Sequence, residues 1–269
     1  MQARIKTCIL SSLIISFVSA CDSDNDIYID PDLRHRLVYQ DDQATACGDQ
    51  VGIDLNTHGK LLVENNIEVH CSQKGHDGLA YTESCGSETG SINIYTIHQG
   101  DLAEAETLGF TALSELDSPQ YDTLCEYNVI SDYRKYALLE QLASQTQKWQ
   151  TESLQDYKFT YHHSFADCPS FAPLPRVEIS VSQGSVSQVY DLDTQTQLSD
   201  LSAYQTIDEI IASLNLKLRL SPIKAGLNSA EPYESPSFSD IGTPLSYYID
   251  QGTDSCDAQV IALSKPESI

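Results

Sequence analysis

The cysteines are the strongest constraint on how this chain can fold. Six of its eight cysteines are spread along the sequence: Cys47, Cys71, Cys85, Cys125, Cys168 and Cys256. An even number of separated cysteines in an exported protein predicts a disulfide framework, here of three bonds. No pair has the C-x-x-C spacing of a thioredoxin-type redox site. The pattern therefore predicts a chain that is crosslinked at three places.

The first twenty residues predict that the protein is exported. They contain a basic start, an apolar run and small residues before a cysteine: Arg4 and Lys6, residues 9–18, Ser19 and Ala20, and Cys21. This arrangement resembles the lipobox of a bacterial lipoprotein, which predicts a signal peptide at residues 1–20 and an acylated Cys21 at the start of the mature chain. A transmembrane helix is the weaker alternative, because the apolar run is short and polar sequence follows it at once.

The lipobox predicts a protein of the bacterial cell envelope that is anchored in the lipid bilayer through acylated Cys21. Asp22 follows that cysteine and resembles a retention signal, which favours the periplasmic face of the inner membrane over the outer membrane. The formal net charge of −24 becomes −26 when residues 1–20 are removed. Because lysine and arginine form no cluster, a nucleic-acid partner is excluded. An anionic membrane surface would also repel this domain, so two or three acyl chains must provide the attachment.

The mature chain is longer than a usual single domain of about 100–150 residues, which predicts two folded domains. Before them, residues 21–44 are acidic and poor in apolar side chains, and we expect a solvated tether there. Residues 22–26 resemble the start of a calcium loop. That loop is not expected, because Ile27 and Leu33 stand where glycine and a bidentate glutamate are required.

Residues 45–128 predict a small disulfide-rich α+β domain. A helix is expected at residues 58–66, a strand from residue 67, a strand at 91–97 and a helix at 101–108. Gly109 is placed to end the second helix. Glycines between residues 75 and 90 predict turns, including a tight turn at residues 86–90.

Residues 129–269 predict a linking helix and a C-terminal domain. The helix is expected at residues 131–154, strands at 157–161, 177–181 and 186–192, a helix at 207–216, and strands at 244–250 and 256–263. Thr206 and Glu209 form a capping-box pattern at the start of the second helix. Residues 217–243 predict a long irregular connection. The predicted fold class is α+β, with two small domains, of which the C-terminal one is an antiparallel β-β-β-α-β-β sheet with one packed helix.

The C-terminal part also resembles a known group of proteins. The matching segments are Lys148-Trp149, residues 154–161, Cys168-Pro169, and residues 176–181, 184–186 and 206–210. Their order and spacing resemble a bacterial lipoprotein family defined by a C-terminal domain of unknown function, over roughly residues 148–265. The chain departs from that family pattern before Cys168, where a second cysteine is common, and at the longer connection of residues 217–240. The resemblance implies a fold and an envelope location but no activity.

The pairing of the six cysteines is only partly determined by the sequence. Three connectivities are possible for the four N-terminal cysteines. We favour Cys71 with Cys85, which flank a glycine-rich reversal, and Cys47 with Cys125; Cys168 with Cys256 is the third pair. A metal site at His70, Cys71, His76 and Cys85 is a weaker alternative, because its spacing matches no standard zinc pattern.

The sequence shows no catalytic motif. A G-x-S-x-G elbow, a P-loop and a dinucleotide fingerprint are all absent. His162 and His163 are adjacent, so on a strand they would point to opposite faces, and a surface position at a strand end is expected. We therefore predict no catalytic residues, no metal ligands and no cofactor.

Tyrosine is unusually frequent, with 15 copies against one Trp and six Phe. Tyr157 and Tyr161 are expected in the core, whereas Tyr233, Tyr247 and Tyr248 are candidates for the surface. Tyrosine is favoured at interfaces. With no catalytic motif, the sequence favours a non-catalytic binding or interaction module, with an envelope protein as a possible partner. The alternatives are an envelope hydrolase with an unrecognised site, or an inhibitor of a periplasmic or extracellular enzyme.

Overall fold

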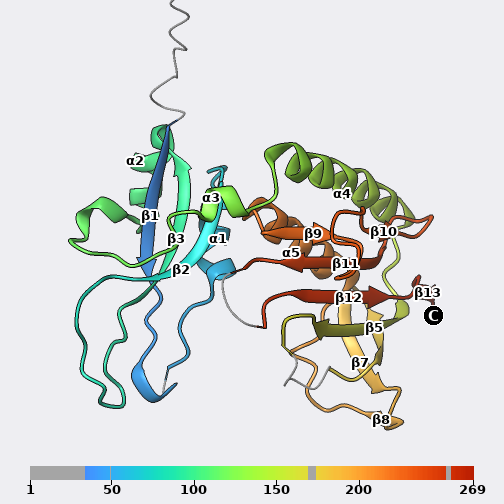
Figure 1. The fold of residues 1–269 in the computed structure, drawn as a ribbon. Helices are drawn as coiled ribbons and strands as arrows, with labels where there is room; N and C mark the ends of the chain where they lie inside the picture. Colours follow the sequence, from blue (N-terminus) through green and yellow to red (C-terminus); the bar gives the residue numbers. More distant parts are fainter. Residues whose placement is uncertain (1–33, 49, 169–173, 253–255) are drawn as a thin grey trace, which may run out of the picture.

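The computed structural model describes residues 34–48, 50–168, 174–252 and 256–269. Figure 1 shows two antiparallel sheets side by side, with helices against each of them. The predicted α+β class with two small sheet-based parts is therefore confirmed. The predicted signal peptide, Cys21 and residues 22–33 lie outside the described residues. No helix within the described ranges is long and apolar enough to cross a bilayer.

The N-terminal half is built on a four-stranded sheet with the order β2-β3-β1-β4. Its elements are β1 (His35–Asp41), η2 (Ala46–Gly48), α1 (Leu55–Glu64), β2 (Cys71–His76), β3 (Ser91–His98), η3 (Gln99–Asp101), α2 (Leu102–Thr107), β4 (Thr111–Ala112), η4 (Leu113–Glu115) and α3 (Cys125–Asn128). β3 and α2 are close to the predicted strand at 91–97 and helix at 101–108. The strand expected from residue 67 begins instead at Cys71.

The prediction of a solvated tether at residues 21–44 is wrong for residues 35–41. Residues 35–41 form β1, which lies between β3 and β4 in the sheet. Val38 at its centre is fully buried in the N-terminal core and pairs with Ala112 of β4. Val38 and Leu37 give too short an apolar run to predict a strand alone, and the strand exists because β3 offers a long partner edge.

The first helix begins earlier than its apolar pattern predicts. α1 starts at Leu55 because the Asp54 carboxylate accepts a hydrogen bond from the Thr57 backbone amide at 2.9 Å. An acidic N-cap accepts a hydrogen bond from an amide of the first turn that would otherwise be unpaired, and its negative charge interacts favourably with the positive end of the helix dipole. Leu62 and Val63 on its inner face are buried against β3.

The C-terminal half contains a nine-stranded antiparallel sheet with the path β10-β11-β12-β5-β6-β7-β8, to which β13 and β9 add at β5 and β11. Its elements are α4 (Asp132–Glu152), β5 (Tyr157–Phe165), β6 (Val177–Ser182), β7 (Ser185–Asp191), β8 (Thr196–Gln197), α5 (Ile207–Arg219), β9 (Lys224–Gly226), β10 (Ser237–Phe238), β11 (Pro244–Asp250), β12 (Gln259–Leu263) and β13 (Glu267–Ser268). The long strands match those predicted, and the segment expected to be irregular contributes the short β9 and β10.

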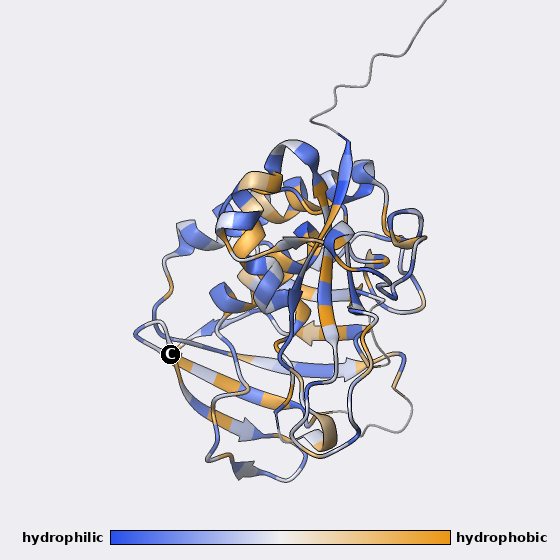
Figure 2. Cartoon of the chain, turned by 90° about the vertical axis from the view of Figure 1, so that its left-hand side faces the viewer, coloured by the Kyte–Doolittle hydropathy of each residue, from blue (hydrophilic) through white to orange (hydrophobic). Residues whose placement is uncertain are grey.

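Alternation of side chains places the C-terminal core on one face of this sheet. β6 buries Val177, Ile179 and Val181 and leaves the residues between them partly exposed. The strands in Figure 2 accordingly change between hydrophobic and hydrophilic colours along their length. β6 and β7 form the predicted hairpin, and its turn residues Gln183 and Gly184 both have positive φ, as a two-residue hairpin turn requires.

Two helices, and not one, pack on the C-terminal core. α5 begins with the predicted capping box, in which Thr206 and Glu209 each accept a hydrogen bond from the other's backbone amide. α4, expected only as a link, buries Leu138, Leu142 and Trp149 in the same cluster. The Trp149 indole also donates a hydrogen bond to Asp208 of α5, so the two helices are joined to each other.

The two halves meet at the end of α5. Leu220 is fully buried and belongs to the hydrophobic cluster of the N-terminal half. Its carbonyl accepts a hydrogen bond from the Ser72 hydroxyl at 2.8 Å, and the Ser221 hydroxyl donates to the Val69 carbonyl at 2.7 Å. Backbone carbonyls that would otherwise lack partners are thus satisfied across the junction, which favours one fixed arrangement of the halves.

Three disulfides are present, but two of the pairings differ from those predicted. Cys47 pairs with Cys85 and Cys71 with Cys125, whereas Cys168 pairs with Cys256 as expected. The expected Cys71–Cys85 pair is wrong because β2 runs away from Cys71 for six residues before the chain reverses. At roughly 3.3 Å a residue, this strand separates the two sulfurs by far more than a disulfide spans. The reversal instead brings Cys85 to the turn around Cys47, where Ala46 and Ser87 are hydrogen bonded.

Candidate functional site

Three histidines from separate segments converge at one end of the N-terminal sheet. His35 opens β1, His98 closes β3, and His70 comes directly before β2. In the antiparallel register His35 lies opposite His98. On the opposite edge of β3 from β1, the His70 backbone amide donates a hydrogen bond to the carbonyl of Thr96 in β3. The three adjacent strands therefore bring residues 35, 70 and 98 together, and we call these side chains the histidine cluster.

The rings of the histidine cluster are in direct contact. His70 Nε2 lies 3.0 Å from His98 Nε2, and the His35 ring stacks on the His70 ring with centroids 4.1 Å apart. One ligating nitrogen from each ring can be chosen so that all three lie within 4.8 Å of one another. His70 is buried, His98 is partly buried and His35 is exposed, so the cluster is open to solvent on one side.

Glu126 holds the exposed member of the cluster. Its carboxylate lies 2.6 Å from Nδ1 of His35. A carboxylate at Nδ1 fixes the proton on that nitrogen and leaves the Nε2 lone pair for another partner. Metal-binding histidines usually have such a carboxylate or carbonyl at their second nitrogen. The Glu126–His35 pair therefore has the arrangement expected around a metal ligand.

A second carboxylate lies beside the other two histidines. Glu68 Oε2 is 3.7 Å from His98 Nε2, while Oε1 accepts hydrogen bonds from the Lys135 ammonium and the Tyr136 hydroxyl. Burial alone would raise the pKa of Glu68, but the hydrogen bonds from Tyr136 and Lys135 outweigh it and lower the pKa to about 2. Glu68 is consequently ionised at any physiological pH and adds negative charge to the cluster.

His70 is the member that most favours a neutral ring. Its pKa is lowered to about 4, mainly by burial, with neighbouring positive charge such as that of Lys135 as a smaller cause. A neutral imidazole has a lone pair for a cation, whereas an imidazolium has none. The neutral His70 ring and the two imidazoles in contact with it together form a site for a cation with a preference for nitrogen ligands.

A second possible ligand set is already occupied by a cation of the protein. Glu68, His70 and Asp132 also place ligand atoms within 4.8 Å of one another. The buried Lys135 ammonium, however, lies 3.1 Å from Glu68 and 3.4 Å from Asp132. The Lys135 ammonium therefore already occupies this group, and the histidine cluster is the better metal site.

The geometry of the cluster suits a tetrahedral transition-metal ion. Zinc–nitrogen bonds of about 2.0–2.1 Å place two ligating nitrogens about 3.3 Å apart. The His70 and His98 nitrogens at 3.0 Å are already close to that spacing, and all three ligand atoms lie within 4.8 Å of one another. Glu68 Oε2 lies 3.7 Å from His98 Nε2 but is not part of the three-histidine set of ligand atoms.

A cavity adjoins the cluster on the side of His35. It has a volume of about 560 Å³, and His35, Arg36 and Glu126 line its polar part. Its apolar part is lined by Leu37, Leu102, Leu113, Leu116 and Tyr121. The Arg36 side chain is held by a hydrogen bond to Gln99. The cavity gives solutes a route to the exposed ring of the cluster.

The structure does not assemble the metal site weighed in the sequence analysis. Cys71 and Cys85 are in different disulfides, and His76 lies at the far end of β2 from His70. His70 is the one residue of that set that enters the histidine cluster. The spacing of residues in the sequence did not predict the cluster, because its members are 35 and 28 residues apart. The one indication in the sequence was that five of the seven histidines lie at residues 35 to 98.

The adjacent His162 and His163 lie inside β5 and not at a strand end on the surface. Burial lowers the pKa of His163 to about 4, and its Nε2 has no hydrogen-bond partner among the described residues. No described pocket opens onto this ring, so we assign it no functional role.

The tyrosine expectations are met only in part. Tyr157 is buried and Tyr233 is exposed, as expected, and Tyr161 packs against the C-terminal core. Tyr247 and Tyr248 were expected at the surface but are buried in β11, because this strand lies between β10 and β12 in the sheet.

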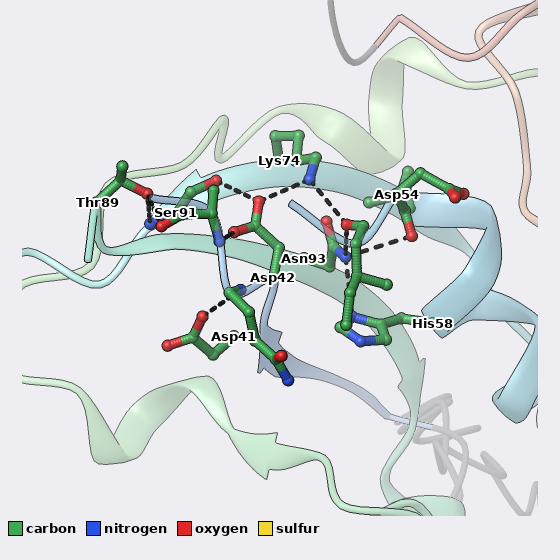
Figure 3. A network of polar contacts seen from close by, with 12 residues as sticks. Asp41, Asp42, Asp54, His58, Lys74, Thr89, Ser91 and Asn93 are labelled. Carbon is green, nitrogen blue, oxygen red and sulfur yellow. Dashed lines mark hydrogen bonds and ion pairs between the residues drawn. The ribbon is translucent and has the colours of Figure 1, made fainter. Parts of the chain in front are cut away.

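A second polar network in the N-terminal half has a structural role. The Asp42 carboxylate accepts hydrogen bonds from Lys74 and Ser91, and Asn93 contacts His58 and the Ile53 carbonyl (Figure 3). The network joins the end of β1 to β2, β3 and the segment before α1. Since Asp42 and Asn93 are buried and hydrogen bonded within the sheet, the network fixes the loop that leads into α1.

Comparison with known proteins gives one family. Residues 141–263 match DUF6174, a family of unknown function. The expected C-terminal domain of unknown function is therefore present. No curated protein and no solved structure matches the chain. The match assigns no chemistry, and every residue of the histidine cluster lies outside it.

Proposed function

We propose that the protein is a lipid-anchored envelope protein that binds a divalent transition-metal ion, without catalysis, through His35, His70 and His98. The observation that carries the proposal is the convergence of three imidazole nitrogens within 4.8 Å. Imidazole ligands favour zinc, copper, nickel and cobalt over magnesium or calcium, which prefer oxygen. The acidic surroundings, with Glu68 and Glu126 beside the rings, further favour a cation.

The position of Glu68 supports binding over hydrolysis. Catalytic zinc sites have three protein ligands and keep one position open for water, whereas closed sites have four protein ligands. Glu68 Oε2 is 3.7 Å from His98 Nε2, and we propose that it moves into the fourth position when a metal ion binds. A three-histidine, one-glutamate set has no open position, which agrees with the absence of a catalytic motif in the sequence.

The predicted anchor would hold this site near a membrane. His35 is fourteen positions after Cys21 in the sequence. At no more than about 3.6 Å a residue, these positions span at most about 50 Å. An acylated Cys21 would therefore keep the histidine cluster within about 50 Å of the bilayer surface. Replacing Cys21 by Ser is expected to move the protein from the membrane fraction to the soluble fraction and to abolish palmitate labelling.

Isothermal titration with zinc chloride tests the metal site. The mature chain with its disulfides intact is expected to bind one equivalent of Zn²⁺. His35→Gln and His98→Gln should each weaken binding by more than the 10–100-fold cost typical of an outer-shell partner. These two rings are partly exposed, so neither change empties a buried position.

His76→Gln is the matched control, because His76 belongs to the same sheet but lies at the opposite end of β2. Equal affinity of the wild type and the His98→Gln variant would refute the proposed site. Equal weakening in the His76→Gln control would do the same.

A further inference from the structure

One of the disulfides lies directly beside the histidine cluster. Cys71 follows His70 and Cys125 precedes Glu126, and the two cysteines are bonded with their Cα atoms 6.0 Å apart. A single covalent bond therefore joins the backbone that carries a buried ligand to the backbone that carries the carboxylate at His35 Nδ1. Cys47–Cys85, by contrast, joins the turn after β1 to the turn after β2, at the other end of the sheet.

Little else holds the Glu126 segment in place. α3 has four residues, none of them buried, and a helix of that length has no stability of its own. Leu124, directly before α3, and Tyr127, within it, are exposed by 57% and 84%. The polar attachments lie outside α3: the backbone pair of His76 with Gln120 and the Gln73–Asp122 hydrogen bonds before it, and the Ile130 amide that donates to the Pro222 carbonyl after it.

We infer that the Cys71–Cys125 disulfide is a positioning element of the metal site, which acts by holding Glu126 against His35. The inference rests on the proposed metal-binding function and adds the device that orders the site. With the bond present, Glu126 holds the proton on Nδ1 of His35 and leaves Nε2 as the nitrogen with a free lone pair. Without it, α3 separates from β2, the carboxylate leaves Nδ1, and the His35 ring loses its fixed tautomer and orientation.

A double-mutant cycle in zinc affinity tests this inference on the full mature chain. The variants are Glu126→Gln, the pair Cys71→Ser with Cys125→Ser, and the three changes together. We expect the Glu126 change and the cysteine pair each to weaken Zn²⁺ binding by about 10–100-fold. Because the disulfide and Glu126 act through the same carboxylate, the variant with all three changes should bind Zn²⁺ no more weakly than the weaker-binding of the other two variants. The visible absorption of bound Co²⁺ should change in the same way in both.

The pair Cys47→Ser with Cys85→Ser is the matched control. It also removes one N-terminal disulfide, but it should leave zinc affinity within about twofold of the wild type. Far-UV circular dichroism at the titration temperature confirms that each variant is folded, and the partly exposed Glu126 provides a variant that does not depend on the cysteines.

Two results would overturn the inference while leaving the metal site intact. One is a multiplicative loss in the combined variant, which would mean that the disulfide and Glu126 act separately. The other is an equal loss in the Cys47 and Cys85 control. A wild-type protein that binds no zinc would overturn the proposed function together with this inference, so the two failures are distinguishable.

Discussion

Leu220 provides a direct test of whether the two halves of the protein unfold together. It caps α5, which belongs to the C-terminal core, yet its side chain is fully buried in the N-terminal cluster. A Cβ added to Gly59 of α1 would lie 2.6 Å from Leu220 Cδ2, so the leucine fits closely against that helix. Leu220→Ala is expected to leave a cavity at the junction, because the hydrogen bonds from the Ser72 and Ser221 hydroxyls to backbone carbonyls limit collapse.

The expected cost of Leu220→Ala is about 3 kcal/mol, within the range of 2–5 kcal/mol for a fully buried leucine. With a urea m-value of about 3 kcal/mol/M for a chain of this size, the midpoint should fall by roughly 1 M. The single Trp149 lies in the C-terminal core, so its fluorescence reports that half alone. Circular dichroism reports both halves.

The two signals should shift together for Leu220→Ala, since the junction couples the halves. Leu79→Ala is the matched control, because Leu79 is 59% exposed and its truncation should change stability by no more than about 0.5 kcal/mol. An unchanged Trp149 midpoint with a biphasic circular dichroism curve would refute this reasoning. It would mean that the halves unfold independently.

Three further changes test single features of the fold by urea unfolding. Thr206→Ala removes the capping box of α5 and should cost about 1 kcal/mol, while Thr206→Ser should restore most of it. Folding lowers the pKa of His163 from 6.5 to about 4, so between these pH values the unfolded chain binds more protons than the folded one. The folded protein therefore loses stability as the pH falls from 6.5 to 4, by about 3 kcal/mol at most. His163→Phe should remove this loss. Asp42→Asn leaves the Lys74 ammonium without its carboxylate and should cost about 3 kcal/mol, whereas Asp240→Asn at an exposed pair should cost less than about 1 kcal/mol.

The sequence predicted the ends of an element closely where all the residues that determine the element are near one another in the sequence. α5 carries its capping box and one apolar face within thirteen residues, so the sequence determines where the helix begins. The β6–β7 hairpin has alternating strands and a Gln183-Gly184 turn, which together determine its register. In both cases the interactions that decide the structure join residues close in sequence.

Features that depend on distant partners were missed or misassigned. β1 is a strand because β3 pairs along its whole length, and no local pattern in residues 35–41 reports that partner. Cys71 and Cys85 looked paired because a turn lies between them, but the direction of β2 carries Cys71 to the opposite end of the sheet. The histidine cluster needs both facts, since it exists only where β1 and β2 flank β3.

The histidine cluster lies in the N-terminal half, outside the residues that match the family. The family match begins at residue 141, whereas His35, His70, His98, Glu68 and Glu126 all precede it. A family with no assigned activity therefore gives no information on this site, and function must be argued from the site's own chemistry. The C-terminal half still contributes to the site, because Lys135 of α4 holds Glu68 and is itself held by Ser221 at the end of α5. Ser221, which lies within the matched residues, thus supports the carboxylate side of the cluster through Lys135, and the N-terminal sheet supplies the imidazoles.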